Sequence, residues 1–355
     1  ESLYLARQMC QEAIELDPNY ANAYVLLATT YSNEVFFGWS ETPAKSLEKA
    51  MELAKKTISL DEQNARAYMV FANVYVNTGQ FKKAEAAQEK AISLDPANSY
   101  INALSGHILF FMGKFKEAIP FLKKAIRLDP KPPTWYLQPL GLSYFFTAQN
   151  EEAIEALNKW VRREPKIAVA HALLGCAFIA AGKPQKAIEI FEKAISLNPD
   201  VPGWYLGHLS VARFGFGQTE AAITMLREAL SRDPKNTEVF LWLSVVLTSE
   251  GKHEEALSMA KKAVSLWKMS PRITAEANFY CFLSVPYLMM GQYEEAIAAS
   301  KKAISLWPQY MYGHILLTAA YNMSDRMEEA RAQAAEVLRI NPKITLEDIA
   351  KNGYL

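Results

Sequence analysis

An alanine stands twelve residues before a proline at seven places in this chain: Ala84 and Pro96, Ala118 and Pro130, Ala153 and Pro165, Ala187 and Pro199, Ala222 and Pro234, Ala296 and Pro308, and Ala330 and Pro342. The prolines of this set from 96 to 234 (96, 130, 165, 199 and 234) lie 34 or 35 residues apart. Such a period is typical of a solenoid, in which stacked supersecondary units share one continuous core. We therefore expect one elongated domain, although 355 residues would ordinarily form two or three globular domains.

Residues 65–98 show what one unit contains. Apolar residues recur at helical spacing from Tyr68 to Tyr75, Gly79 interrupts them, and a second amphipathic run extends from Phe81 to Leu94. Each unit is thus predicted to be a helix, a tight turn and a second helix. Glycines recur at the turn (Gly79, Gly113, Gly182, Gly217, Gly251 and Gly291), where we expect a left-handed cap, with Gln149 and Ser324 taking the glycine position in two units.

The aromatic, leucine, small, alanine and proline positions of these units resemble the tetratricopeptide repeat over almost the whole chain. The resemblance implies an all-α, right-handed superhelix of about nine helix-turn-helix repeats plus a truncated first repeat. Residues 1–18 would supply only the second helix of that first repeat, residues 19–342 the array, and residues 343–355 a C-terminal capping helix or tail. We therefore expect the chain to be part of a longer polypeptide.

Two insertions interrupt the repeat, near residues 34–43 and 269–274. The first contains Phe36, Phe37 and Trp39, for which two interpretations stay open. These aromatic residues either belong to a lengthened helix end that packs on the neighbouring repeat, or form a projecting loop that touches a ligand or a second subunit.

Four segments resemble the tetratricopeptide region of bacterial class III adenylate and guanylate cyclases: residues 36–54, the Pro-x-Trp-Tyr-Leu sequences at 133–137 and 202–206, and residues 341–351. The sensor half of some winged-helix transcriptional regulators is similar. The resemblance implies a regulatory or protein-interaction module attached to a signalling output domain in a bacterial protein. It carries over no catalytic residue, because the cyclase domain itself would lie outside this chain.

In the tetratricopeptide family the first helices line a concave groove, and the family's inward positions can be carried over to this chain. They imply partner contacts at Arg66, Met69, Asn73, Asn77, His107, Phe110, Phe111, Trp135, Gln138, Phe145, Phe146, Trp204 and Phe214. The set lacks the lysines of a carboxylate clamp, and its middle is aromatic and apolar. It therefore predicts a hydrophobic peptide, an amphipathic helix or a second copy of the array as partner. The alternative is that Phe110, Phe145 and Phe214 pack between neighbouring first helices.

Composition excludes several other functions. Lys and Arg together equal Asp and Glu at 38 each, which does not indicate a nucleic-acid partner. No apolar run is long enough to span a bilayer, and membrane contact is not indicated. Cys10, Cys176 and Cys281 are too widely spaced for a disulfide framework or a zinc site.

No nucleophile with a nearby base and no metal or cofactor motif is recognisable in the sequence. We expect a non-catalytic segment without cofactor, in the cytoplasm, or in the periplasm if a membrane helix precedes it. Its function would be that of an interaction or sensor module, whose parent would carry the cyclase domain. The alternative is a free-standing tetratricopeptide scaffold or assembly factor that self-associates, for instance as a homodimer.

Overall fold

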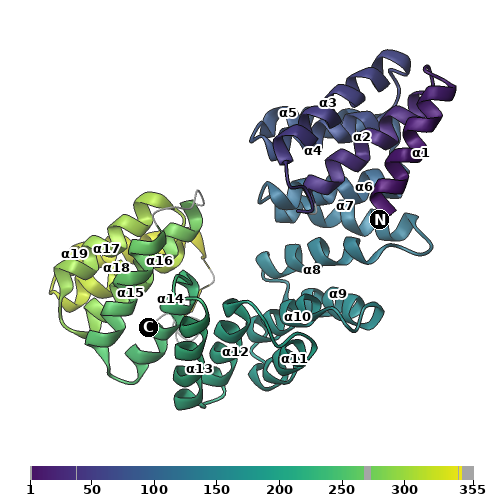
Figure 1. Ribbon diagram of the computed structural model, residues 1–355. Coiled ribbons are helices and arrows are strands. Elements are labelled where there is room, and N and C mark those ends of the chain that lie inside the picture. Colours follow the sequence, from purple (N-terminus) through teal and green to yellow (C-terminus); the bar gives the residue numbers. More distant parts are fainter. Residues whose placement is uncertain (1, 37, 268–272, 343, 346–355) are drawn as a thin grey trace. The chain divides into compact units, whose positions relative to one another are not determined.

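The structure is a computed structural model that describes residues 2–36, 38–267, 273–342 and 344–345. These residues form nineteen α-helices and one 3₁₀ turn, and no strand occurs among them. The chain divides into two compact units, Glu1–Ala181 and Gly182–Leu355. Within each unit, consecutive helices lie side by side as antiparallel pairs (Figure 1). The predicted all-helical solenoid of helix-turn-helix units is therefore confirmed.

Unit 1 contains eleven of these elements. They are α1 (Ser2–Leu16), α2 (Ala21–Phe36), α3 (Pro43–Leu60), α4 (Ala65–Asn77), α5 (Phe81–Leu94), α6 (Ser99–Phe111), α7 (Phe115–Leu128), η1 (Thr134–Tyr136), α8 (Leu137–Phe146), α9 (Asn150–Arg163) and α10 (Ala168–Ala180).

Unit 2 contains the other nine helices. They are α11 (Pro184–Leu197), α12 (Gly203–Gly215), α13 (Thr219–Arg232), α14 (Thr237–Ser249), α15 (His253–Trp267), α16 (Ile273–Met289), α17 (Tyr293–Leu306), α18 (Met311–Met323) and α19 (Met327–Ile340).

The recurring alanines hold the helices of a pair close together. All seven are buried, and six of them are completely inaccessible: Ala84, Ala118, Ala153, Ala187, Ala222 and Ala296. The first helix contributes an equally small residue, such as Gly141 on α8, where a Cβ atom would lie 2.6 Å from Leu157 Cγ on α9. A larger side chain at either position would push the pair apart.

The turns between paired helices use the left-handed region of the backbone. All six predicted glycines have a φ between 67° and 81°. The prediction for the other two turns was wrong by one residue, because Ala148 (φ 57°) and Asp325 (φ 59°) take the glycine position, and not Gln149 and Ser324. Both residues lie five positions before the buried alanine of their repeat, as the glycines do in the other repeats.

The two helix starts with a Pro-x-Trp-Tyr sequence differ in structure. In unit 1 the residues after Pro133 form η1, and α8 begins only at Leu137. In unit 2 α12 begins directly after Pro202, so that Trp204 lies in its first turn.

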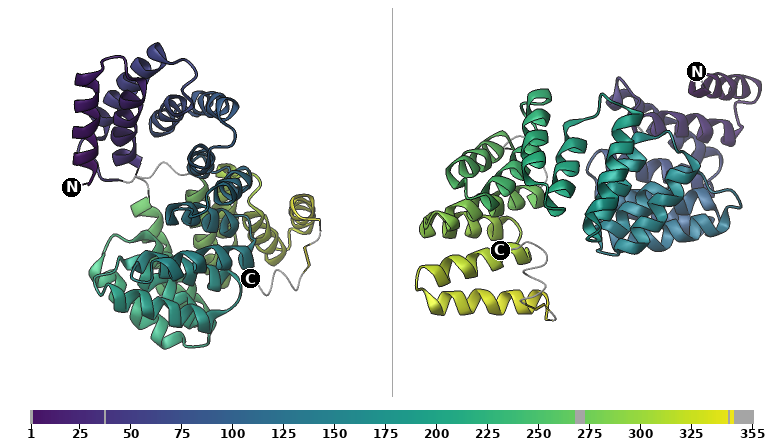
Figure 2. Two further views of the ribbon diagram at one scale, coloured as in Figure 1. Left: turned by 90° about the vertical axis from the view of Figure 1, so that its right-hand side faces the viewer. Right: turned by 90° about the horizontal axis from the view of Figure 1, so that it is seen from below.

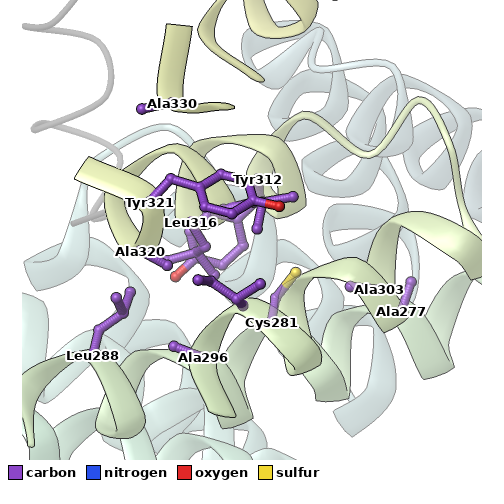
Figure 3. Packing of buried hydrophobic residues seen from close by; sticks show 12 residues of the cluster. Ala277, Cys281, Leu288, Ala296, Ala303, Tyr312, Leu316, Ala320, Tyr321 and Ala330 are labelled. Atoms are coloured by element: carbon purple, nitrogen blue, oxygen red, sulfur yellow. The ribbon is translucent and has the colours of Figure 1, made fainter. Parts of the chain in front are cut away.

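The core of unit 2 around α16, α17 and α18 shows how neighbouring pairs share side chains. Figure 3 shows Tyr312, Leu316 and Tyr321 of α18 above Cys281 and Leu288 of α16. Cys281 is completely buried, and this burial raises the pKa of its thiol. It therefore packs as a small hydrophobic residue.

Candidate functional site

The structure places the predicted groove residues in three environments. Arg66, Asn77, Phe111 and Phe146 are exposed; Phe110, Trp135, Gln138, Phe145, Trp204 and Phe214 are partly buried; Met69, Asn73 and His107 are buried. Those in the range 66–146 lie in unit 1, whereas Trp204 and Phe214 lie in unit 2.

The buried members connect neighbouring repeats. Asn73 Nδ2 donates a hydrogen bond to Ser32 Oγ (2.7 Å) and so links α4 to α2, while its Oδ1 accepts one from Asn77 Nδ2 (2.7 Å). Met69 Sδ accepts a weak hydrogen bond from Ser105 Oγ (3.9 Å) on α6. These hydrogen bonds occupy the side-chain polar atoms of Asn73 within the stacked repeats. Few of its hydrogen-bonding positions are therefore left for a partner.

The aromatic residues of unit 1 meet in one cluster that begins at the first insertion. The ring of Phe36, at the end of α2, lies 4.6 Å from that of His107 and 5.5 Å from that of Phe111, both on α6. The Trp135 ring lies 5.7 Å from His107. The insertion thus lengthens α2 far enough for Phe36 to reach α6.

The same cluster continues onto α7 and α8. The Phe110 ring lies 5.7 Å from Phe111 and 6.4 Å from Phe146, and so stands between these two exposed rings. Phe115, the first residue of α7, stacks on Phe146 with centroids 4.6 Å apart. Phe145 meets Phe146 edge to face at 5.3 Å.

We call these residues the aromatic surface: Phe36, His107, Phe110, Phe111, Phe115, Trp135, Phe145 and Phe146. Phe111 and Phe146 keep 52% and 54% of their area exposed, although other rings contact both of them. Burial lowers the pKa of His107 to about 3, so that its imidazole is neutral at physiological pH. The aromatic surface therefore offers apolar rings and no formal charge.

A charged neighbour of the aromatic surface, Arg66, lies near the start of a first helix. The Arg66 guanidinium carbon stands 5.7 Å from the centre of the Tyr100 ring, and that ring lies 6.1 Å from Trp135. A guanidinium over a ring is attracted by the ring's quadrupole. Arg66 thus contributes a positive charge on α4 beside the aromatic residues.

In unit 2 the aromatic residues form a separate row. Trp204 contacts His208 at 5.7 Å on α12, and contacts of 6.0–6.3 Å continue through Trp242 on α14 and Phe282 on α16 to Tyr312 on α18. All of these rings are partly or fully buried. We interpret the row as packing between first helices.

The loop of the first insertion combines a polar network with an exposed ring. Glu34 Oε2 lies 2.7 Å from an Arg7 guanidinium nitrogen, and its Oε1 accepts a hydrogen bond from Ser46 Oγ. Trp39 is 64% exposed. Phe37 lies outside the described residues, as do 269–272 of the second insertion and most of the predicted C-terminal tail.

Within the described ranges, no cluster of three or more His, Cys, Asp or Glu side chains could hold a metal ion. In the same part of the chain, none of the helices has the length and apolarity that a membrane span requires.

Models of the tetratricopeptide repeat match residues 9–42, 65–98, 100–132, 168–201, 213–266 and 277–317, which together make up well over half of the chain. Among curated proteins, the TPR repeat-containing protein YpiA of Bacillus subtilis is 30% identical over 127 residues, 35% of this chain and 30% of its own length. The chain spans less than a third of the length of the curated relatives it matches.

Solved structures share the fold at low identity. A tetratricopeptide repeat protein from Parabacteroides merdae superposes with a TM-score of 0.63 at 19% identity, covering 73% of this chain and all of that one (100%). Yeast Tom70 superposes with a TM-score of 0.60 at 16% identity, covering 99% of this chain and 84% of its own.

Sequence reasoning missed Phe115 and three members of the row in unit 2, namely His208, Trp242 and Phe282. Phe115 was outside the groove positions because it begins a second helix, yet its position directly after the turn brings it against the end of the next first helix. His208, Trp242 and Phe282 each lie two residues before a serine that recurs on the first helices (Ser210, Ser244 and Ser284), so the row in unit 2 could have been found by aligning the repeats.

Proposed function

This chain belongs to the tetratricopeptide-repeat family, and we propose that it is a non-catalytic protein-interaction module that holds an apolar segment of a partner on the aromatic surface. The observation that carries the proposal is the pair of exposed rings, Phe111 and Phe146, joined through Phe110. Rings already held in place lose little conformational freedom when a partner covers them, which favours binding.

The size of the effect follows from the exposed area. A phenylalanine offers about 200 Å² in total, so the exposed halves of two rings present about 200 Å² of apolar surface. Covering that area contributes about 5 kcal/mol before the costs of association. The two rings can therefore act as the centre of an interface, although further contacts must add to them.

The chemistry of the surface defines the class of partner. The exposed rings carry no charge and His107 is neutral. Arg66 places a positive charge beside the surface, and Lys114, the residue before Phe115, forms an ion pair with Glu85. A segment with two or more aromatic or aliphatic side chains on one side fits this surface better than an acidic or basic segment. An amphipathic helix presents such side chains at intervals of three and four residues.

A random library of 16-residue peptides displayed on phage provides the probe. We expect selection on the chain to enrich peptides with aromatic or aliphatic residues at helical spacing. Binding of these peptides should be lost in the double variant Phe111→Ser, Phe146→Ser. The control is Phe81→Ser on α5, because Phe81 is 48% exposed and lies outside the aromatic surface. Enrichment of charged peptides, or equal loss with Phe81→Ser, would count against the proposal.

We further propose that the parent protein is a bacterial nucleotide cyclase that this module regulates. Support comes from the sequence segments 36–54, 133–137, 202–206 and 341–351, which resemble the region that follows the cyclase domain. Sequencing the gene upstream of the codon for Glu1 tests this point. A cyclase domain in frame is expected, and a different output domain would exclude it.

A further inference from the structure

The outer side of α7 carries cations around a proline. The inner side of this helix packs on its partner α6 through three buried residues: Ala118, Leu122 and Ala125. The opposite side presents four exposed residues at spacings of four, three and four positions: Lys116, Pro120, Lys123 and Arg127. The helix lies two repeats away from α1, the purple helix at the start of unit 1 (Figure 2).

A surface groove of about 550 Å³ follows this outer side. It is lined by Ile119, Pro120, Lys123, Lys124 and Arg127. Ile119 and Pro120 supply apolar surface at the middle of the helix, and the three cations stand around it. Pro120 also has no N–H, so the carbonyl four residues earlier does not receive the helical hydrogen bond that another residue would donate. The groove thus combines an apolar centre, three cations and a backbone acceptor.

The cations of α7 have no local partner. Among the described residues, no ion pair includes Lys116, Lys123, Lys124 or Arg127. Lys116 lies in the first turn of α7, where the helix dipole favours an acid, and a glutamate takes the equivalent position in α9, α13, α15, α17 and α19. Neither the dipole nor a neighbouring acid stabilises these charges, so they are available to a partner.

We propose that this groove binds an acidic segment of a partner protein that carries one apolar side chain between its acids. The apolar side chain covers Ile119 and Pro120, and the acids pair with the surrounding cations. Lys116 and Arg127 are eleven positions apart, which is about 17 Å along the helix. Like charges repel one another and keep an acidic segment extended, so about five of its residues span this length.

The width of the charged strip favours a single segment over an anionic membrane surface. Helix α7 has four basic residues and one acidic residue, whereas α5 has three and two, and α9 has three of each. The excess of positive charge is therefore concentrated on one helix, which a single segment can follow. A bilayer would extend across α5 and α9 as well, where the acids oppose binding to anionic lipids.

The probe is the fluorescein-labelled peptide Glu-Glu-Glu-Leu-Glu-Glu-Glu, titrated with the 355-residue chain at about 50 mM salt and followed by fluorescence anisotropy. We expect binding that weakens about threefold or more at about 200 mM salt, because the attraction is screened. Replacing the leucine of the peptide by serine should weaken binding about tenfold, since the apolar contact is lost. The peptide Lys-Lys-Lys-Leu-Lys-Lys-Lys should not bind.

The double variant Lys123→Glu, Arg127→Glu should weaken binding of the acidic peptide about tenfold or more, because two attractions become repulsions. The matched control, Lys193→Glu with Lys302→Glu, makes the same change of net charge at exposed positions on α11 and α17. It should leave the dissociation constant within about threefold of its original value. All four side chains are exposed, and circular dichroism verifies that both double variants fold.

The proposal is independent of the aromatic surface, so Phe111→Ser with Phe146→Ser should leave binding of the acidic peptide unchanged. Three results would overturn it: no binding of the acidic peptide, equal binding of the leucine and serine peptides, or an equal loss in the control variant. Vesicles of phosphatidylcholine with about 30% phosphatidylserine test the membrane alternative. If the chain sediments with these vesicles through Lys123 and Arg127 but does not bind the peptide, the groove is a membrane contact and the proposal fails.

Discussion

Replacing Gly141 by alanine tests the packing within a repeat at a single atom. The new Cβ would lie 2.6 Å from Leu157 Cγ and 2.7 Å from its Cδ2, about 1 Å inside an ordinary carbon contact. Leu157 is completely buried and cannot swing away. Overpacking of this kind costs about 1–3 kcal/mol. Alanine regains about 1 kcal/mol of helix propensity relative to glycine. We expect the free energy of unfolding to fall by about 2 kcal/mol in total, because a 1 Å overlap lies at the upper end of the range of overpacking costs.

The matched control is Gly207→Ala on α12. Its Cβ would lie 3.5 Å from Val239 Cγ2 and 3.7 Å from Trp242 Cδ1, which are ordinary contacts. We therefore expect a gain of about 1 kcal/mol from helix propensity alone.

Urea unfolding followed by circular dichroism measures both variants, and hydrogen exchange of α9 and α14 localises each effect. In a Leu157→Ala background the penalty at Gly141 should disappear. A Gly141→Ala chain that gains as much stability as Gly207→Ala would refute the close-approach argument.

Three further changes have defined outcomes. Phe191→Ala removes a completely buried ring and should lower the stability of unit 2 by about 3–5 kcal/mol in urea unfolding; a loss below about 1 kcal/mol would contradict its burial. Ala148→Gly should raise stability by about 1 kcal/mol, because φ at this residue is 57°; a decrease would mean that the turn is unstrained. Burial lowers the pKa of His107 from 6.5 to about 3, so the unfolded chain takes up a proton below about pH 6.5 that the folded chain does not. The free energy of unfolding therefore falls as the pH falls from 6.5 toward 3. His107→Phe should lose less stability than the unchanged chain in that window when their urea midpoints are compared. Identical pH profiles of the two chains would contradict the lowered pKa of His107.

The helix-turn-helix architecture could be predicted from the sequence because the constraints on it are local. A small residue is required wherever two helices approach, and a residue with positive φ wherever the turn reverses the chain. Such requirements recur in every unit, so Ala84 and Gly79 indicate the same geometry as Ala296 and Gly291. In two turns the predicted left-handed residue was wrong by one position, because Ala148 and Asp325 reach this region without the glycine that marks it elsewhere.

The candidate site was less predictable because the exposure of a side chain depends on its contacts with neighbouring repeats, and these repeats differ in length. His107 occupies an inward position, yet Phe36 from the lengthened α2 covers it. Likewise, the Asn73 side chain donates a hydrogen bond to Ser32 of the preceding repeat and is buried there. Phe111 and Phe146 each end their first helix, where the rings of neighbouring helices contact them but leave about half of their area exposed.

Titration calorimetry with a peptide selected on the chain tests the central claim most directly, because it measures affinity at named rings. The account predicts that Phe111→Ser and Phe146→Ser together weaken binding at least about a hundredfold, corresponding to the loss of about half of the apolar contribution of the two rings. Phe81→Ser should leave the dissociation constant unchanged. An affinity that survives in the double variant, with thermal stability also unchanged, would contradict the assignment of the binding site to the aromatic surface.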